Sequence, residues 1–476
     1  MRKKAFLALM LALTLLALSG CTLIQKDPAV DAATEILRLG DAVVTKGEIQ
    51  DEVDYQLDYM AYLYSMYGYS YDKTSPENIA EVQASVIDSF KKDLVTDAKM
   101  EELGLEANLT EEEQAEIQSN AEETFQDNLN YVLSNYTDDT EMSLEEKTEK
   151  ATEDLAAMGY TMEEALEDAK ADKLNELLRE YVVKDVTVSD EEIQADYDSR
   201  VASAKETYEN NAGSWATAAN NGSTLYYTPA GVRYVKQILV KFLDDDQAAI
   251  DEANKKADDA AAKATEARAK VTSAESDAEY AQSVLDREDA TEEEKKAAQS
   301  DLDAANAAKE EAEAEIVAAN NEEAAAREEA DQATEKAFAN IDEAADGILA
   351  ELELGADWDT LMADRTQDPG MQSGITAERG YAVSADMTSF DSAFVDAAMA
   401  LQKIGDVSGK VKGTSYGYYI IRYVGDAAEG PIALDEVKES IRSSLQSTKE
   451  NDTYNNTIQS WVDAASFKED LKALNK

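Results

Sequence analysis

The sequence predicts an α+β protein that is mainly helical, with small β elements between long helical stretches. Two short apolar runs, residues 36–39 and 42–44, flank the turn pair Gly40-Asp41, as in two paired strands. Thr45 then stands three residues before Glu48, a capping box that opens a helical pattern continuing to about residue 183. Residues 250–285 place a small apolar residue at every third or fourth position, which is typical of a helix-helix seam.

Residues 1–21 have the features of a targeting segment. Three basic residues precede an apolar run that is too short to span a bilayer comfortably, and the segment ends in Leu18-Ser19-Gly20-Cys21. This ending resembles the lipobox of bacterial lipoproteins, which implies lipidation of Cys21 and an extracytoplasmic, membrane-anchored chain. The alternative is an ordinary signal peptide with an incidental cysteine. Because Cys21 is the single cysteine, an intramolecular disulfide is excluded.

The composition restricts the partners. The chain of 476 residues has 101 acidic and 44 basic residues and a formal net charge of -57. Such acidity argues against nucleic acid or anionic lipid as a partner, and favours basic or neutral polypeptides. The alternative is that the charge only keeps an exposed protein soluble. The length predicts two to four domains, and no later run is long and apolar enough to cross a membrane.

The elements expected after the first helix follow from caps and composition. Further capping boxes occur at Thr110 with Glu113 and at Thr161 with Glu164. Residues 186–192 predict a strand followed by a new helix start, and residues 210–231, rich in Asn, Gly, Ala and Ser, predict a linker. Residues 434–461 are helical again.

The seam of residues 250–285 belongs to a larger insertion, residues 246–333. Residues 286–290 interrupt the pattern, Thr291 with Glu294 caps a second helix, and the spacing then repeats less strictly to residue 333. We expect an antiparallel coiled-coil hairpin whose arms of roughly 38 residues extend about 55–60 Å. Its alanines bury little area each, which predicts modest stability. The arm is expected to give reach or shielding, or to be a plain spacer.

The stretch from Trp358 to Tyr423 carries the most specific motifs: Thr366-Gln367-Asp368-Pro369, Gly380-Tyr381, Met387, Phe394, Ala400-Leu401, Gly405 and Tyr416-Gly417-Tyr418-Tyr419-Ile420-Ile421. These resemble the parvulin family of peptidyl-prolyl isomerases, with residues 232–240 as the first strand and 337–354 as the first helix. The order of the flanking segments resembles extracytoplasmic foldases of the PrsA and SurA type. The resemblance implies this organisation: 1–21 signal peptide, 22–34 tether, 35–230 with 431–476 helical chaperone domain, 231–245 with 334–430 parvulin-like domain, and 246–333 coiled-coil insertion.

The resemblance also implies a site. Asp368 stands where parvulins carry Cys or Asp near the rotating bond, and Met387, Phe394 and Thr414 match residues that hold proline, with Phe390 as a competitor of Phe394. Gln237 and Tyr419 replace the two family histidines, and the chain contains no histidine. A hydrogen-bond chain joining Gln237, Asp368 and Tyr419 is chemically possible, although neither replacement can shuttle a proton near neutral pH. Arg379 predicts a more polar pocket edge. Without the family, the apolar residues would be ordinary core.

No other catalytic signature is present. The sequence contains no nucleophile elbow, phosphate-binding loop or metal motif, so no cofactor or metal is expected, and residues 244–246 predict a solvated loop rather than a calcium site. The expected function is a foldase for partly folded secreted polypeptides with X-Pro bonds, with isomerase activity that is reduced if present. The alternatives are a non-catalytic holdase or peptide-binding scaffold, and a surface assembly protein that acts through the coiled coil.

Overall fold

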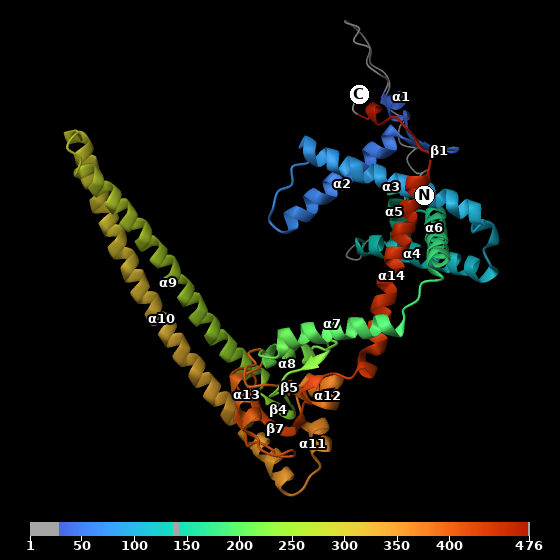
Figure 1. Ribbon diagram of the computed structural model, residues 1–476. Coiled ribbons are helices and arrows are strands. Elements are labelled where there is room, and N and C mark those ends of the chain that lie inside the picture. Colours follow the sequence, from blue (N-terminus) through green and yellow to red (C-terminus); the bar gives the residue numbers. More distant parts are fainter. Residues whose placement is uncertain (1–27, 137–141, 475–476) are drawn as a thin grey trace. The chain divides into compact units, whose positions relative to one another are not determined.

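The computed structural model describes residues 28–136 and 142–474 and is mainly helical with small sheets, as predicted (Figure 1). The chain forms two compact units. The helical unit takes the described parts of Met1–Ser189 and Arg442–Lys476, and the sheet unit takes Asp190–Ile441. Residues 1–27, including Cys21 and the predicted signal segment, lie outside the described residues.

The helical unit begins with the predicted strand pair. After α1 (Pro28–Ala32), strands β1 (Glu35–Leu39) and β2 (Ala42–Thr45) pair antiparallel around Gly40, whose φ of +58° lies in the left-handed region that glycine favours. Strand β9 (Lys468–Glu469) pairs with the other edge of β1, giving the order β2-β1-β9. The two ends of the described chain therefore share one small sheet.

Five helices follow in the N-terminal part of this unit, with one 3₁₀ turn: α2 (Lys46–Met66), α3 (Pro76–Leu103), η2 (Glu106–Asn108), α4 (Glu111–Ser134), α5 (Leu144–Ala157) and α6 (Met162–Val183). The capping boxes of Thr45 with Glu48 and of Thr110 with Glu113 are confirmed, and at Thr161 the side chain accepts from the backbone N–H of Glu164. Helix α14 (Leu434–Ala464) and η4 (Leu471–Ala473) complete the chain. The buried side chains of Ile36, Ile49 and Val86 form the centre of the core beside the sheet.

Two sequence predictions about the connecting segments were wrong. Residues 186–189 form no strand, and α7 (Asp190–Tyr208) follows directly. The backbone carbonyls of Val186 and Thr187 accept hydrogen bonds from Gln446 and Lys449 of α14, so side chains replace a strand partner. The predicted linker, residues 210–231, contains α8 (Ala212–Asn220) and β3 (Tyr227–Thr228), which pairs with β8 (Gly430–Pro431). Its small residues allow close helix packing rather than mobility.

The sheet unit is built on a four-stranded antiparallel sheet of order β5-β4-β7-β6. Its strands are β4 (Arg233–Lys241), β5 (Tyr381–Val383), β6 (Val411–Lys412) and β7 (Gly417–Asp426), and its short helices are α11 (Trp358–Arg365), η3 (Pro369–Met371), α12 (Ile375–Arg379) and α13 (Ser392–Ala400). Alternate residues of β4 enter two different cores, because strand side chains point to opposite faces. Ile238 faces the core beneath α11, whereas Leu239 faces the core beneath α8 and α13.

Helices α9 (Asp244–Leu285) and α10 (Glu292–Glu353) form a long pair that leaves the sheet (Figure 1). The pair is antiparallel, because Lys256, Lys263 and Lys270 form ion pairs with Glu329, Glu322 and Glu315. Most alanines of the predicted seam are buried along both helices. The capping box at Thr291 is confirmed, whereas coiled-coil supercoiling of the seam stays a prediction. Helix α10 continues without a break into the helix that packs on the sheet.

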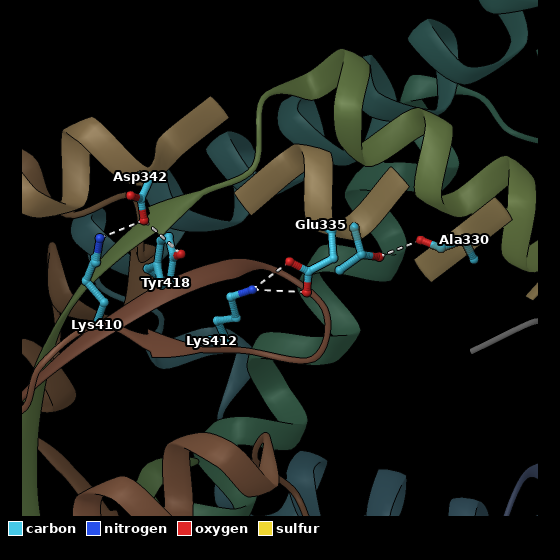
Figure 2. A network of polar contacts seen from close by, with 7 residues as sticks. Ala330, Glu335, Asp342, Lys410, Lys412 and Tyr418 are labelled. Carbon is cyan, nitrogen blue, oxygen red and sulfur yellow. Dashed lines mark hydrogen bonds and ion pairs between the residues drawn. The ribbon is translucent and has the colours of Figure 1, made fainter. Parts of the chain in front are cut away.

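Polar contacts attach the near end of α10 to the sheet (Figure 2). Asp342 accepts hydrogen bonds from Lys410 at 2.6 Å and from the Tyr418 hydroxyl at 3.0 Å, while Lys412 reaches Glu335 at 2.9 Å. These contacts, together with the buried Phe338, fix the direction in which the helix pair leaves the sheet.

None of the described helices has both the length and the apolar character to cross a bilayer.

Candidate functional site

A cavity of about 360 Å³ opens at the face of the sheet that α13 covers. Strands β4 and β7, the turn before η3 and the segment leading into α13 supply its walls. It is lined by Gln237, Leu239, Lys241, Gln367, Asp368, Pro369, Tyr381, Ser389, Phe390, Asp391, Phe394, Tyr416 and Tyr419. Four of the six residues predicted from the family, namely Gln237, Asp368, Phe394 and Tyr419, therefore share one hollow.

Asp368 lines this cavity and is buried. One carboxylate oxygen accepts a hydrogen bond from Nε2 of Gln237 at 2.6 Å. The other accepts from the backbone N–H of Gly370 at 2.9 Å and from the Tyr381 hydroxyl at 3.1 Å. Donors on both oxygens compensate for the loss of water around this carboxylate, which suits a positioning role better than that of a free base.

The predicted hydrogen-bond chain forms only its first link. The Tyr419 hydroxyl donates to Asp391 at 3.3 Å instead of to Asp368. The same Asp391 oxygen accepts from the backbone N–H of Thr414 at 2.6 Å and from its hydroxyl at 3.0 Å. Thr414 thus acts on the cavity through Asp391 and is not among the lining residues. The cavity has two separate carboxylate clusters, one centred on Asp368 and one on Asp391.

Tyr381 and Asp391 line the cavity but were not predicted as site residues. Asp391 is the N-cap of α13, where its second oxygen accepts from the backbone N–H of Ala393 at 2.9 Å. An aspartate directly before a helical segment is a recognisable cap signal, so this position was accessible to sequence reasoning. Tyr381 follows Gly380 in the motif, but only the fold shows that its hydroxyl reaches Asp368.

Aromatic rings form one wall of the cavity. Tyr381, Phe390, Phe394 and Tyr419 contact each other in sequence at centroid distances of 5.1, 5.7 and 5.3 Å, each pair edge to face. Such contacts hold rings in fixed orientations and leave an apolar surface for a small ring. Phe390 and Phe394, the two candidates for the family phenylalanine, both line the cavity.

Met387 does not line the cavity. It is buried in the core beneath α8, close to the place where Gly213 approaches the backbone of Asp386. A Cβ at Gly213 would lie 2.7 Å from the carbonyl oxygen of Asp386, so this approach requires glycine. Phe390, three residues after Met387, lines the cavity, whereas Met387 packs in the core.

Arg379 does not make the cavity edge polar, contrary to the prediction. Its guanidinium donates to the carbonyl oxygen of Ala219 at 3.2 Å and lies over the ring of Tyr234. Asn220, the last residue of α8, forms hydrogen bonds with both the N–H and the C=O of Ala382 in β5, at 2.8 and 2.9 Å. These contacts attach α8 to the edge of the sheet.

One buried acceptor in the cavity is left for a ligand. Within the described part of the chain, Oε1 of Gln237 is buried and has no hydrogen-bond partner. Burial, together with the neighbouring carboxylate of Asp368, raises the pKa of Tyr381, and burial with Asp391 raises that of Tyr419. Both hydroxyls therefore stay protonated at neutral pH. The cavity can accept an apolar ring and a hydrogen-bond donor.

No metal site was found in residues 28–136 and 142–474: no three His, Cys, Asp or Glu side chains there are arranged to hold an ion. Residues 244–246 were predicted to form a solvated loop, but all three lie in the first turn of α9. Asp246 accepts a hydrogen bond from Asn340 at 2.7 Å and pairs with Lys336, so it links the bases of the two long helices.

Comparison with curated proteins confirms the predicted resemblance to PrsA-type foldases. A foldase protein PrsA of Clostridium botulinum is 30% identical over 130 residues, which cover 27% of this chain and 37% of the relative. One of Clostridium perfringens is 24% identical over 198 residues, covering 41% and 51%. The chain thus spans at most about half of these relatives, and no family model matches it.

Two solved structures align with most of the chain at low overall similarity. A SurA-like chaperone of Campylobacter jejuni aligns over 91% of this chain and 98% of its own, with a TM-score of 0.23 and 14% identity. The foldase protein PrsA of Streptococcus pneumoniae aligns over 93% and 97%, with a TM-score of 0.24 and 13% identity.

Proposed function

We propose that this chain is a lipid-anchored extracytoplasmic foldase. Its cavity takes an X-Pro segment of a translocated polypeptide, and its helical segments hold partly folded clients. The observation that carries the proposal is the cavity itself, in which Asp368, Gln237 and Phe394 meet. The similarity to foldase proteins named PrsA supports the same function.

The domain organisation is part of this proposal. Residues 231–245 with 334–430 form the parvulin-like domain, and residues 246–333 form its coiled-coil insertion. Residues 35–230 with 431–476 form the client-holding domain; of this range, α7 and α8 belong to the compact sheet unit. Residues 1–21 form the signal peptide, 22–34 the tether, and Cys21 carries the lipid.

The chemistry asked of the cavity is modest. Rotation about an X-Pro bond breaks no σ bond, although amide resonance sets a barrier of about 18–20 kcal/mol. An enzyme lowers this barrier when it binds the twisted amide more tightly than the planar one. In our proposal Phe390 and Phe394 hold the proline ring, and Gln237, oriented by Asp368, offers its Oε1 to a peptide N–H. Tyr419 and Tyr381 contribute neutral hydroxyls.

The test is a protease-coupled isomerisation assay on a proline tetrapeptide with the full chain. We expect catalysis that falls about tenfold or more in Phe394→Ala and in Gln237→Leu, a loss of about 1.4 kcal/mol or more of transition-state stabilisation. Tyr423→Phe is the control, because Tyr423 is a buried ring of β7 in the same sheet but outside the cavity lining. Since the chain contains no histidine, the side chain that ordinarily titrates near neutral pH, the rate should be constant between about pH 6 and 9.

A non-catalytic holdase is the second candidate, favoured by the fully hydrogen-bonded Asp368 and by Gln237 and Tyr419 in the places of histidines. Wild-type rates equal to the uncatalysed reaction, together with suppressed aggregation of a reduced, unfolded client, would select it over the isomerase. A wild-type chain that neither catalyses isomerisation nor suppresses aggregation would exclude both functions.

Anchoring is tested separately. Cys21→Ala should move the chain from the membrane fraction to the soluble fraction and abolish incorporation of radiolabelled palmitate. A chain that still sediments with membranes after this change is not anchored through Cys21.

A further inference from the structure

The exposed face of α2 carries an unusual set of aromatic side chains. Tyr55, Tyr59, Tyr62 and Met66, which we call the tyrosine face, follow one another at helical spacing and are each at least 50% exposed. The rings of Tyr55 and Tyr59 are stacked, with centroids 6.4 Å apart and an interplanar angle of 9°. The opposite side of the helix, at Ile49, Val53 and Leu57, is buried in the core. An exposed apolar surface of this kind marks an interaction site.

The tyrosine face leads into a groove between α2 and α3. The groove has a volume of about 550 Å³, and Tyr55 lines it. Its apolar floor includes Val86, Phe90 and Leu94. Five carboxylate residues line it as well, namely Glu48, Asp51, Glu52, Asp93 and Asp97, and its lining contains no lysine or arginine. We call it the acidic groove.

Charge selects the occupant of this continuous surface. An ammonium or guanidinium group gains from the carboxylates of the groove and from the faces of the tyrosine rings. A second copy of the chain would bring the same negative groove against itself, and the net charge of -57 opposes such pairing. An anionic lipid surface is opposed for the same reason.

We propose that the tyrosine face and the acidic groove together bind an extended polypeptide segment in which Lys or Arg alternates with apolar residues. From Glu48 to Met66 the helix spans about 27 Å, which matches about eight residues of extended chain. The inference deepens the proposed foldase function, on which it rests, by naming the class of client segment. It concerns the helical unit and is independent of isomerisation.

The experiment measures binding of fluorescent peptides to the full chain by anisotropy. The probe is an eight-residue peptide of alternating lysine and leucine, compared with glutamate-leucine and lysine-serine peptides of the same length. We expect the lysine-leucine peptide to bind tightest and to lose affinity as salt is raised. Equal binding of the glutamate-leucine peptide would overturn the proposal.

Variants then locate the site. In Tyr55→Ser/Tyr59→Ser/Tyr62→Ser we expect the Kd to rise at least about tenfold, because each lost ring removes a cation-π contact and apolar area. Tyr131→Ser/Tyr280→Ser is the matched control, because these tyrosines are 76% and 73% exposed on other helices. Asp51→Asn/Asp97→Asn should reduce the dependence on salt. An unchanged Kd in the triple variant overturns the surface.

The same variants separate this inference from the foldase proposal. If the triple variant suppresses client aggregation as well as wild type while peptide binding is unaffected, the surface is wrong and the foldase function stands. If wild type sediments as a dimer and the triple variant as a monomer, the occupant of the surface is a second copy of the chain, and the proposed client class is wrong.

Discussion

The two ends of α10 bury different kinds of side chain. Near the sheet, Phe338, Ile341 and Ile348 are buried, and the ring of Phe338 contacts Phe242 at 4.8 Å and Tyr418 at 4.9 Å. Farther along, the buried residues facing α9 are alanines, such as Ala305, Ala312 and Ala319. A buried phenylalanine removes several times more apolar area from water than an alanine, so the near end should be far more stable.

This difference shows how one continuous helix can be rigid where it meets a site and locally unstable where it extends away. Local unfolding follows buried apolar contact rather than helix length. We therefore expect amide hydrogen exchange to be slow from Ala333 to Ile348 and to become faster toward the turn at residues 286–291.

The largest effect is expected at Phe338. Phe338→Ala leaves a cavity between α10 and the sheet, and should lower the free energy of unfolding of the sheet unit by about 3–5 kcal/mol. Denaturant unfolding followed by tryptophan fluorescence measures this, because Trp358 belongs to the same core. Leu354→Ala is the control, since Leu354 is 90% exposed. Equal loss in both variants would contradict the comparison.

A smaller effect is expected in the seam. Ala319→Leu overpacks the contact between α9 and α10 and should cost about 1–3 kcal/mol of local stability. Hydrogen exchange should become faster in the outer part of the pair and stay unchanged at Phe338. Val317→Ala, at an exposed position of the same helix, should leave exchange as in wild type. Faster exchange at the base in Ala319→Leu would show that the two ends unfold as one.

A still smaller effect is expected in the pH dependence of stability at the sheet end of α10. A hydrogen bond from Lys410 is the main cause that lowers the pKa of Asp342, followed by one from Tyr418. A lowered folded-state pKa adds stability above the unfolded value of about 3.9, and this is lost as the pH falls through the folded pKa. Asp342→Asn should therefore lose less stability than wild type between about pH 4 and 2. An identical acid limb would contradict this.

The smallest effect is expected from ion pairs along the outer seam. Lys270 lies 2.7 Å from Glu315, and hydrogen bonding to that carboxylate raises its pKa, but both side chains are solvent exposed. Exposed pairs gain little and are screened by salt. Lys270→Ala should leave the thermal midpoint unchanged in about 0.15 M salt. A clear fall would show that charge, and not alanine packing, holds the outer seam.

Local patterns predicted much of this fold. The caps at Thr45, Thr110 and Thr291 and the strand pair around Gly40 depend on residues within a few positions of each other, and all are present. The prediction of a strand at residues 186–189 was wrong because the hydrogen-bond partner of this segment, α14, lies about 260 positions later in the chain. The prediction of a linker at residues 210–231 was wrong because small residues are common in closely packed helices as well as in linkers.

The candidate site was predicted in part for the same reason. The strand and motif positions brought Gln237, Asp368 and Phe394 to one cavity. The partner of Tyr419 was missed, because Asp391 reaches it only through the turn at Thr414 and the start of α13. Met387 was misplaced because sequence spacing does not reveal that α8 covers it.

The hydrogen bonds between Asn220 and Ala382 have a consequence for the proposed binding of unfolded polypeptides. An open sheet edge is a template on which a foreign strand can add and from which aggregates can grow. Here an amide side chain occupies the N–H and C=O groups that a foreign strand would use at β5. If the chain binds unfolded polypeptides, as we propose, this closed edge prevents strand addition to the chain itself and leaves client binding to side chains.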